Sequence, residues 1–400
     1  MSANALSGAW AQGSDEIRVG LIGCGGRGTG AARNVVDAAP GVRIVAMADA
    51  FKDRLDESRA ILAGRLGDKF AVTDETCFVG LDAYQHLLQA NVNYVILATP
   101  PAFRPGHIKA AVAAGKHIFA EKPVAVDGAG VRSCLESFEE MKQKGLGLLT
   151  GTLYRHHTGY LESIKRVHDG QIGDIVGLNG WYNTSGLWRK DRQPQWSDLE
   201  YQMRNWLYYT WLSGDHIVEQ AVHNIDALNW IMRGNPVRAV ATGGRQVRTG
   251  PDWGHIYDHF AVDYEYPNGV HVSMFTRQQD NTDKKVANEV VGTKGRAFIL
   301  PKFYITGEAP WTLETEINDG YVTEHTHLIE SLRAGKPLNE LKQVAESSLT
   351  AIMGRNSAYT GKTITWDDAL SDPVSLMPAK LEWGPMPTPP VPMPGQVGTA

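Results

Sequence analysis

The sequence predicts an α/β protein with two domains, and two patterns in the chain carry this prediction. In the first half, short apolar runs at residues 17–22 and 91–99 alternate with helical segments, which is typical of a doubly wound parallel sheet. In the second half, residues 237–241, 260–266 and 269–276 alternate apolar with polar side chains, as half-buried strands do. A length of 400 residues is compatible with this division.

Composition excludes several classes of protein. The formal net charge of -5 gives no electrostatic footprint for a nucleic acid. No apolar run approaches the roughly 20 residues that a membrane span requires. The three cysteines, Cys24, Cys77 and Cys134, lack the spacing of a metal site, and we interpret them as buried thiols. We therefore expect neither a nucleic-acid partner nor a membrane span.

A glycine-rich turn lies between the first predicted strand, residues 17–22, and a predicted helix over 29–39. The turn follows the pattern G-x-G-x-x-G, in which glycines permit a tight turn and the helix N-terminus faces a pyrophosphate. This arrangement predicts a Rossmann domain over residues 17–148 that binds a dinucleotide. The residues of the turn that we assign to the cofactor are Gly23, Gly25, Gly26, Arg27 and Gly28.

The second predicted strand, residues 43–48, ends at Asp49. An acid at this point accepts hydrogen bonds from the ribose diol of adenosine and repels a 2′-phosphate. The sequence therefore favours NAD over NADP, although Lys52 and Arg54 nearby leave NADP as the less favoured alternative.

Two further strand ends open onto the same edge of the predicted sheet, where ligands of such sheets bind. The strand over 91–99 ends at Thr99 and Pro100, and the strand over 116–120 is followed by Glu121 and Lys122. We assign these four residues to the cofactor site. Lys122 is placed to donate to a substrate oxygen or to relay a proton; the alternative is a surface lysine before a proline.

A predicted helix over residues 213–233 begins with Asp215 as N-cap and places polar side chains at steps of three and four along one stripe. Glu219 comes one turn before His223, so its carboxylate is expected to hold one imidazole nitrogen and leave the other free as a general base. A polar stripe facing solvent is the alternative. The stripe contains His216, Glu219, His223, Asp226 and Trp230.

The glycine turn, the sequence AEKP at residues 120–123 and the acid four residues before a histidine together resemble the Gfo/Idh/MocA oxidoreductase family, over about residues 17–370. The resemblance implies that Lys122, Glu219 and His223 are the catalytic residues, although the usual acid of the family is aspartate. It also implies an α/β domain over residues 149–371 with an open, mostly antiparallel sheet, and a homo-oligomer (dimer or tetramer) formed through that sheet.

Candidates for substrate contact lie between the two domains and in a tryptophan-rich segment. The resemblance implies an arginine at the cleft near Arg155, whose alternative is a basic surface turn. Aromatic rings stack on sugar rings but are equally ordinary core residues. Trp188 and Trp196, in a polar loop, are better candidates than the tryptophans of apolar runs. The full set comprises Tyr154, Arg155, His156, Trp188, Trp196, His216, Asn224 and His259. Neither His255 and His259 nor the histidines near Glu219 complete a metal site.

Residues at the two ends of the chain carry different patterns. Residues 1–16 are small and polar, and Ala9-Trp10-Ala11 resembles the end of a cleaved export signal, which predicts a periplasmic or secreted protein; a disordered leader on a cytoplasmic protein is the alternative. Residues 372–400 are rich in proline and are expected to run extended over the surface or against a neighbouring subunit.

These observations predict an NAD-dependent oxidoreductase that transfers a hydride from a hydroxyl of a sugar or glycoside, with a pyranose ring, to the nicotinamide. His223 takes the hydroxyl proton, Lys122 polarises the oxygen and Glu219 orients His223. One alternative is a glycosidase that passes through a transient 3-keto sugar. A second is a redox-neutral exchange between two sugars with a cofactor that never leaves. A third, from another class, is a non-enzymatic sensor of NAD or sugar.

Overall fold

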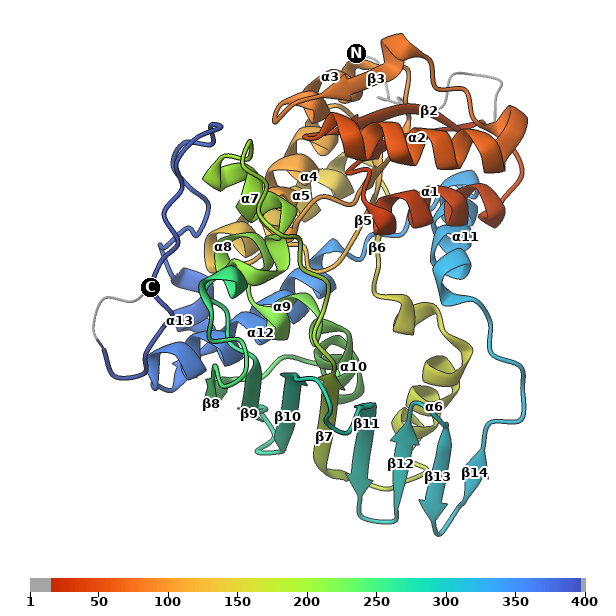
Figure 1. Cartoon of the computed structure of the whole chain (residues 1–400). Coiled ribbons are helices and arrows are strands. Elements are labelled where there is room, and N and C mark those ends of the chain that lie inside the picture. The colour runs from red at the N-terminus through yellow and green to blue at the C-terminus, as the bar shows by residue number, and fades with distance from the viewer. Residues whose placement is uncertain (1–15, 397–400) are drawn as a thin grey trace, which may run out of the picture.

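The computed structural model describes residues 16–396, so almost all of the predicted leader lies outside the described residues. The first domain contains a six-stranded parallel sheet with the order β3-β2-β1-β4-β5-β6 (Figure 1), which confirms the predicted doubly wound sheet. Its strands are β1 (Ile17–Ile22), β2 (Val42–Asp49), β3 (Cys77–Val79), β4 (Tyr94–Leu97), β5 (His117–Ala120) and β6 (Leu148–Thr150).

Helices on both faces bury this sheet, which explains why its central strands are continuous apolar runs. The strand order reverses between β1 and β4, and the carboxyl ends of these two strands flank the crevice where ligands of such folds bind. The helices are α1 (Gly26–Ala38), α2 (Lys52–Leu66), α3 (Ala83–Gln89), α4 (Arg104–Ala113) and α5 (Gly128–Lys144).

The second domain contains a nine-stranded sheet with the order β14-β13-β12-β11-β7-β10-β9-β8-β15. Its paired neighbours are antiparallel except β7 and β10, so the expected open, mostly antiparallel sheet is confirmed. The strands are β7 (Ile175–Thr184), β8 (Arg238–Gly244), β9 (His259–Glu265), β10 (His271–Gln278), β11 (Lys285–Gly292), β12 (Gly295–Ile299), β13 (Tyr304–Gly307), β14 (Trp311–Thr312) and β15 (Ile364–Thr365).

Helices cover one face of this second sheet. In Figure 1 they lie between the two sheets, and the side of the second sheet turned away from the first domain stays open. Burial alternates along β9, as the sequence pattern predicts for a strand with one covered face. The helices that pack on this sheet are α6 (Thr158–His168), α10 (Val222–Met232), α12 (Leu341–Thr360) and α13 (Trp366–Ser371).

One helix from the second half of the sequence packs on the first domain. Helix α11 (Gly320–Arg333) lies along α1, at the right of Figure 1. Leu328, Ile329 and Leu332 join the apolar core beneath β1 and β2, and the hydroxyl of Tyr94 lies 3.0 Å from Nδ1 of His325. The chain therefore returns to the first domain after β14, before β15 adds the last strand of the second sheet.

The segment 213–233 is not the single helix that the sequence pattern predicts. It forms α8 (Thr210–Ser213), α9 (His216–Glu219) and then α10. Gly214 and Asp215 both adopt positive φ, 79° and 74°, which ends α8 before α9 begins. Asp215 does cap α9, and its buried carboxylate also accepts hydrogen bonds from the Tyr257 N–H and the Tyr359 hydroxyl, which hold this unusual backbone in place.

Two irregular segments lie side by side at the left of Figure 1. One is the tryptophan-rich connection from β7 to α9, which contains α7 (Asp198–Arg204) and α8; the other is residues 372–396, which form no helix or strand. The Leu199 N–H donates to the carbonyl of Gly384, and the rings of Phe51 and Trp383 lie 5.6 Å apart. The two segments and the first domain therefore share a small apolar core.

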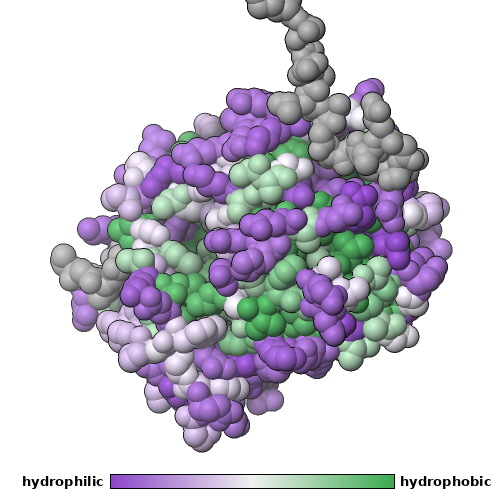
Figure 2. Space-filling view, turned by 90° about the horizontal axis from the view of Figure 1, so that it is seen from above, coloured by the Kyte–Doolittle hydropathy of each residue, from purple (hydrophilic) through white to green (hydrophobic). Residues whose placement is uncertain are grey.

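The surface is that of an ordinary globular protein. Seen from above the first domain, hydrophilic side chains surround scattered hydrophobic ones (Figure 2).

Of the cysteines, Cys24 and Cys134 are buried and Cys77 is half-buried, and all three are free thiols. Over residues 16–396, no helix has the length and apolar character to cross a bilayer, and no three His, Cys, Asp or Glu side chains are grouped to bind a metal.

The packing of α11 on α1 can be tested by truncating a core side chain. Leu328 is 0% exposed, so Leu328→Ala is expected to lower the free energy of unfolding by about 2–5 kcal/mol in urea denaturation. Leu161, on α6, is 40% exposed, and Leu161→Ala is the matched control with an expected change of at most about 0.5 kcal/mol. Equal effects of the two substitutions would contradict the assigned packing.

Candidate active site

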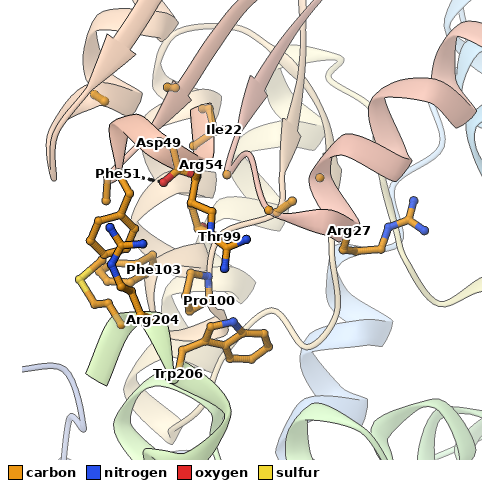
Figure 3. Close-up of a pocket in the computed structure, with 18 of the residues that line it drawn as sticks. Ile22, Arg27, Asp49, Phe51, Arg54, Thr99, Pro100, Phe103, Arg204 and Trp206 are labelled. Carbon is orange, nitrogen blue, oxygen red and sulfur yellow. Dashed lines mark hydrogen bonds between the residues drawn. The ribbon is translucent and has the colours of Figure 1, made fainter. Parts of the chain in front are cut away.

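A cavity of about 630 Å³ opens at the carboxyl ends of β1, β2 and β4, at the predicted crevice (Figure 3). The first domain supplies the glycine turn, Asp49, Thr99 and Pro100. The second domain supplies the opposite wall from Trp188, Arg189, Lys190, Met203, Arg204 and Trp206. The cavity is therefore enclosed by both domains, although the motif that predicts it lies in only one of them.

The glycine turn has the shape that a dinucleotide requires. Gly23 adopts a φ of +98°, and a Cβ on Gly28 would lie 1.9 Å from the carbonyl oxygen of Gly23. Gly25 and Gly26 face open space, and no side chain caps the start of α1. The N-terminal amides of α1 are thus open to an anion, and the chain fits the pyrophosphate of a dinucleotide.

Asp49 lines the cavity at the end of β2, where the sequence places it. Its carboxylate accepts hydrogen bonds from the backbone N–H of Cys24 at 2.6 Å and of Phe51 at 2.9 Å. Burial raises the pKa of Asp49, and these two N–H groups partly offset that effect. Because each oxygen retains a free lone pair, the carboxylate both fastens the turn and remains able to accept a ribose hydroxyl.

Arg27 and Glu121 form an ion pair, with Nε and Oε1 2.9 Å apart. Arg27 also lies over the ring of Tyr321 on α11, at 4.7 Å. Figure 3 shows its side chain at the far edge of the cavity, apart from the side chains around Asp49. Of the four residues predicted at the strand ends, Thr99 and Pro100 line the cavity, whereas Glu121 and Lys122 lie outside its wall.

Lys122 and Glu219 join the two domains in a buried ion pair. The ammonium donates to the backbone carbonyl of Glu219 at 2.6 Å and to its Oε1 at 3.0 Å. Only 10% of the lysine side chain and 8% of the glutamate side chain are exposed. An ammonium has three N–H donors, so one remains for a third acceptor.

His223, in the first turn of α10, is half-buried beside Tyr154, with ring centroids 5.3 Å apart. Its Nδ1 has no hydrogen-bond partner among the described residues. Burial lowers the pKa of His223 well below its ordinary value, and the positive charge of Lys122 lowers it further. The imidazole is therefore neutral at neutral pH and able to accept a proton.

The expected contact between Glu219 and His223 is absent. Helix α9 ends at Glu219 and α10 begins at Val222, so the two residues are not on one continuous helix. The carboxylate of Glu219 turns to Lys122 instead. The acid thus holds the lysine, and the imidazole is kept uncharged by its burial first and by the neighbouring ammonium second.

Three candidate residues follow β6: one lies beside His223, and the other two are held by partners elsewhere in the structure. Tyr154 lies against His223, and burial raises its pKa to about 12. Arg155, expected at the cleft, instead pairs with Asp226 through two hydrogen bonds of 2.8 and 3.0 Å. His156, also expected there, is buried with its Nδ1 2.8 Å from that of His327. Neither Arg155 nor His156 therefore lies free at the cleft, because each has a partner far away in the sequence.

Three further candidates have structural partners. His216 bonds to the carboxylate of Asp215 and is buried. The Asn224 amide donates to the carbonyls of Trp181 and Ala287, where it fastens α10 to the sheet. His259 pairs with Asp258 and lines a shallow pocket that shares no residue with the nucleotide cavity.

The two tryptophan candidates lie on the nucleotide side of the molecule. Trp188 lines the nucleotide cavity and is 47% exposed. Trp196 packs on the guanidinium of Arg204, 4.9 Å from its ring. Trp188 thus faces the cavity, and Trp196 contacts Arg204 of the cavity wall; the prediction that these rings stack on a sugar stays a prediction.

Sequence reasoning missed Arg104, a buried residue at the start of α4. Its guanidinium donates to the carbonyl of Thr99 and to that of Pro123, next to Lys122. Burial lowers the pKa of Arg104 to about 10. Arg104 therefore ties together the two loops that carry the strand-end residues, and no local pattern signals this role.

The fold and the glycine turn define a dinucleotide-binding protein, and comparison with known proteins specifies the family. Residues 17–151 match the oxidoreductase family with an NAD-binding Rossmann fold, and residues 160–298 match the GFO/IDH/MocA C-terminal domain. The chain belongs to the Gfo/Idh/MocA family, and its cofactor is NAD.

Curated relatives match along most of their length. The chain is 23% identical to the scyllo-inositol 2-dehydrogenase (NAD(+)) of Bacillus subtilis (strain 168) over 335 residues, 80% of this chain and 87% of that protein. It is 25% identical to the inositol 2-dehydrogenase of Rhizobium meliloti (strain 1021) over 313 residues, 78% of this chain and 82% of that protein.

Solved structures share the fold at low sequence identity. The aldose-aldose oxidoreductase from Caulobacter crescentus, complexed with glycerol, matches with a TM-score of 0.68 and 17% identity over 88% of this chain and 99% of that one. The scyllo-inositol dehydrogenase from Lactobacillus casei with bound NAD(H) and scyllo-inositol matches with a TM-score of 0.66 and 18% identity, at the same coverage.

The proximity of Lys122 and His223 can be tested without a substrate. Because the ammonium disfavours the imidazolium, Lys122→Met is expected to raise the pKa of His223 toward its ordinary value. The measurement is an NMR titration of the histidine rings, with the His223 signal assigned by its loss in His223→Gln. Lys116→Met, at the opposite end of β5, is the control. An unchanged His223 titration in Lys122→Met would place the two groups apart.

Proposed function

We propose that this protein oxidises a ring hydroxyl of a sugar or cyclic polyol. The observation that carries the proposal is the buried Lys122–Glu219 ion pair between the domains, which lies near enough to His223 for the ammonium to lower the pKa of its imidazole. Bound NAD supplies a nicotinamide that accepts a hydride. The curated relatives act on inositols by name, and this supports a polyhydroxylated ring as the substrate class.

The residues divide the proton chemistry between them. The neutral imidazole of His223 takes the proton of the hydroxyl that is oxidised, since burial and Lys122 keep it uncharged. The third N–H of Lys122 donates to the same oxygen and stabilises its negative charge as the proton leaves. Glu219 holds Lys122 through two hydrogen bonds and is a positioning residue.

The glycosidase alternative needs a further base to remove a C–H proton next to a transient ketone. Tyr154 is the phenol beside His223, and with its pKa raised to about 12 it stays protonated at neutral pH. A protonated phenol donates hydrogen bonds but removes no proton. Tyr154 therefore does not supply the base that elimination of an aglycone needs.

Two properties of the whole protein belong to the same proposal. The open face of the second sheet carries the stacked rings of Trp181 and Phe275, 6.4 Å apart, and Phe275 is 39% exposed. Such a face supports association of identical subunits through this sheet. Export to the periplasm rests on the Ala9-Trp10-Ala11 pattern alone.

Loss of either proton-handling group should slow the reaction strongly. Lys122→Ala and His223→Ala are each expected to lower kcat by about two to four decades with cyclic polyols, because general acid–base assistance contributes that much. NAD binding, measured by calorimetry, should persist in both variants, since neither residue lines the cavity.

His271→Ala is the matched control for these variants. His271 is an exposed histidine on β10 that pairs with Asp263, so its loss is expected to leave kcat unchanged. Undiminished turnover in His223→Ala or in Lys122→Ala would remove that residue from the mechanism.

Product analysis separates the three reactions. Simple oxidation forms one NADH for each polyol consumed. Release of an aglycone without net NADH would instead indicate the glycosidase route, and paired oxidation and reduction of two sugars would indicate redox-neutral exchange. Tight NAD binding without turnover on any sugar or polyol would return the protein to the class of sensors.

A further inference from the structure

The segment between β7 and α7, in the second domain, places the side chain of Lys190 in the wall of the nucleotide cavity. Lys190 lines the cavity opposite the glycine turn, together with Arg189 and Trp188. Figure 3 shows neighbouring residues of the same connection, Arg204 and Trp206, facing Phe51 and Pro100 of the first domain. None of these residues belongs to the G-x-G-x-x-G turn or to the Lys122–His223 pair.

Lys190 is held in this position by its backbone. Its N–H donates to Oδ1 of Asn205 at 2.8 Å, and its carbonyl accepts from Nδ2 of the same asparagine at 3.1 Å. Asn205 is 0% exposed. The adjacent Arg204 makes a two-bond ion pair with Asp53 of α2, at 2.9 and 3.0 Å, and lies over the ring of Phe51 at 4.1 Å.

The ammonium of Lys190 has neither a hydrogen-bond nor an ion-pair partner within residues 16–396. Arg54 lines the same cavity from the first domain. Its guanidinium lies 4.0 Å from the carboxylate of Glu57, which is too far for a hydrogen bond. Figure 3 shows Arg54 extending into the cavity toward Thr99 and Pro100. Two cations from different domains therefore face one cavity, and neither makes a hydrogen bond to a carboxylate of the described residues.

The acidic groups nearby have other partners. Asp49 accepts two backbone N–H groups, and Asp53 is occupied by Arg204. Partial burial lowers the pKa of Lys190, repulsion from Arg54 and then from Arg204 lowers it further, and attraction to Asp53 and Glu57 offsets part of the shift. An anion placed between Lys190 and Arg54 relieves this repulsion, and the phosphates are the anionic groups of a dinucleotide.

We propose that Lys190 and Arg54 form a phosphate subsite for the bound cofactor, built from both domains. The chemistry that they recognise is a phosphate group of the dinucleotide. It comes either from the pyrophosphate, which NAD and NADP share, or from a 2′-phosphate, which only NADP carries. In both cases the cofactor bridges the two domains, so its release requires breaking contacts on both walls of the cavity.

The test measures binding rather than turnover. Dissociation constants of the full-length protein for NAD and NADP are determined by calorimetry for the wild type, Lys190→Ala and Arg54→Ala. Loss of a charge-assisted hydrogen bond to phosphate is expected to weaken binding by about tenfold or more. Lys190→Arg, which keeps the charge, is expected to restore most of the affinity.

Arg65→Ala is the matched control, because Arg65 carries the same charge as Arg54 and lies in the last turn of the same helix, outside the cavity. The melting temperature of each variant without cofactor shows that the fold is intact. An equal loss of affinity for NAD and NADP in Lys190→Ala assigns the pyrophosphate, and a loss confined to NADP assigns the 2′-phosphate. Affinities in Lys190→Ala and Arg54→Ala that match those of Arg65→Ala would overturn the proposal.

Discussion

The buried ion pair between Lys122 and Glu219 is the constraint on which the rest of the site depends. Burying two charges costs about as much as their attraction returns, so such a pair adds little net stability, whereas loss of one partner leaves a buried charge uncompensated. Its effect here is positional: it sets the lysine of the first domain against α9 of the second. One N–H of the ammonium and the neutral imidazole of His223 are then available at the boundary between the domains.

Contacts far from this pair keep the boundary closed. On one side α11 packs on α1, and on the other the connection from β7 to α9 fastens to α2 through Arg204 and Asp53. The chain passes between the domains several times, so their relative position is determined by packing on both flanks. Arg104 adds a local brace, because it ties the loop of Thr99 to the loop of Lys122.

The sequence revealed what depends on neighbours along the chain. The strand before the glycine turn, the turn itself and Asp49 were predictable, because their requirements are local. The partner of Glu219 was not, since Lys122 lies 97 residues away and the helix expected to join Glu219 to His223 is broken. Arg155 and His156 were expected at the cleft, and only the structure shows that their partners are Asp226 and His327. Lys190 lies in an irregular segment that has no periodic pattern to read.

A crystal structure of the protein with NAD and a cyclic polyol tests the central claim most directly. The account predicts one ring oxygen within hydrogen-bond distance, about 2.6–3.2 Å, of both the Lys122 ammonium and a nitrogen of His223, with its carbon facing the nicotinamide. A polyol bound elsewhere, or an oxygen contacted by neither group, would contradict it.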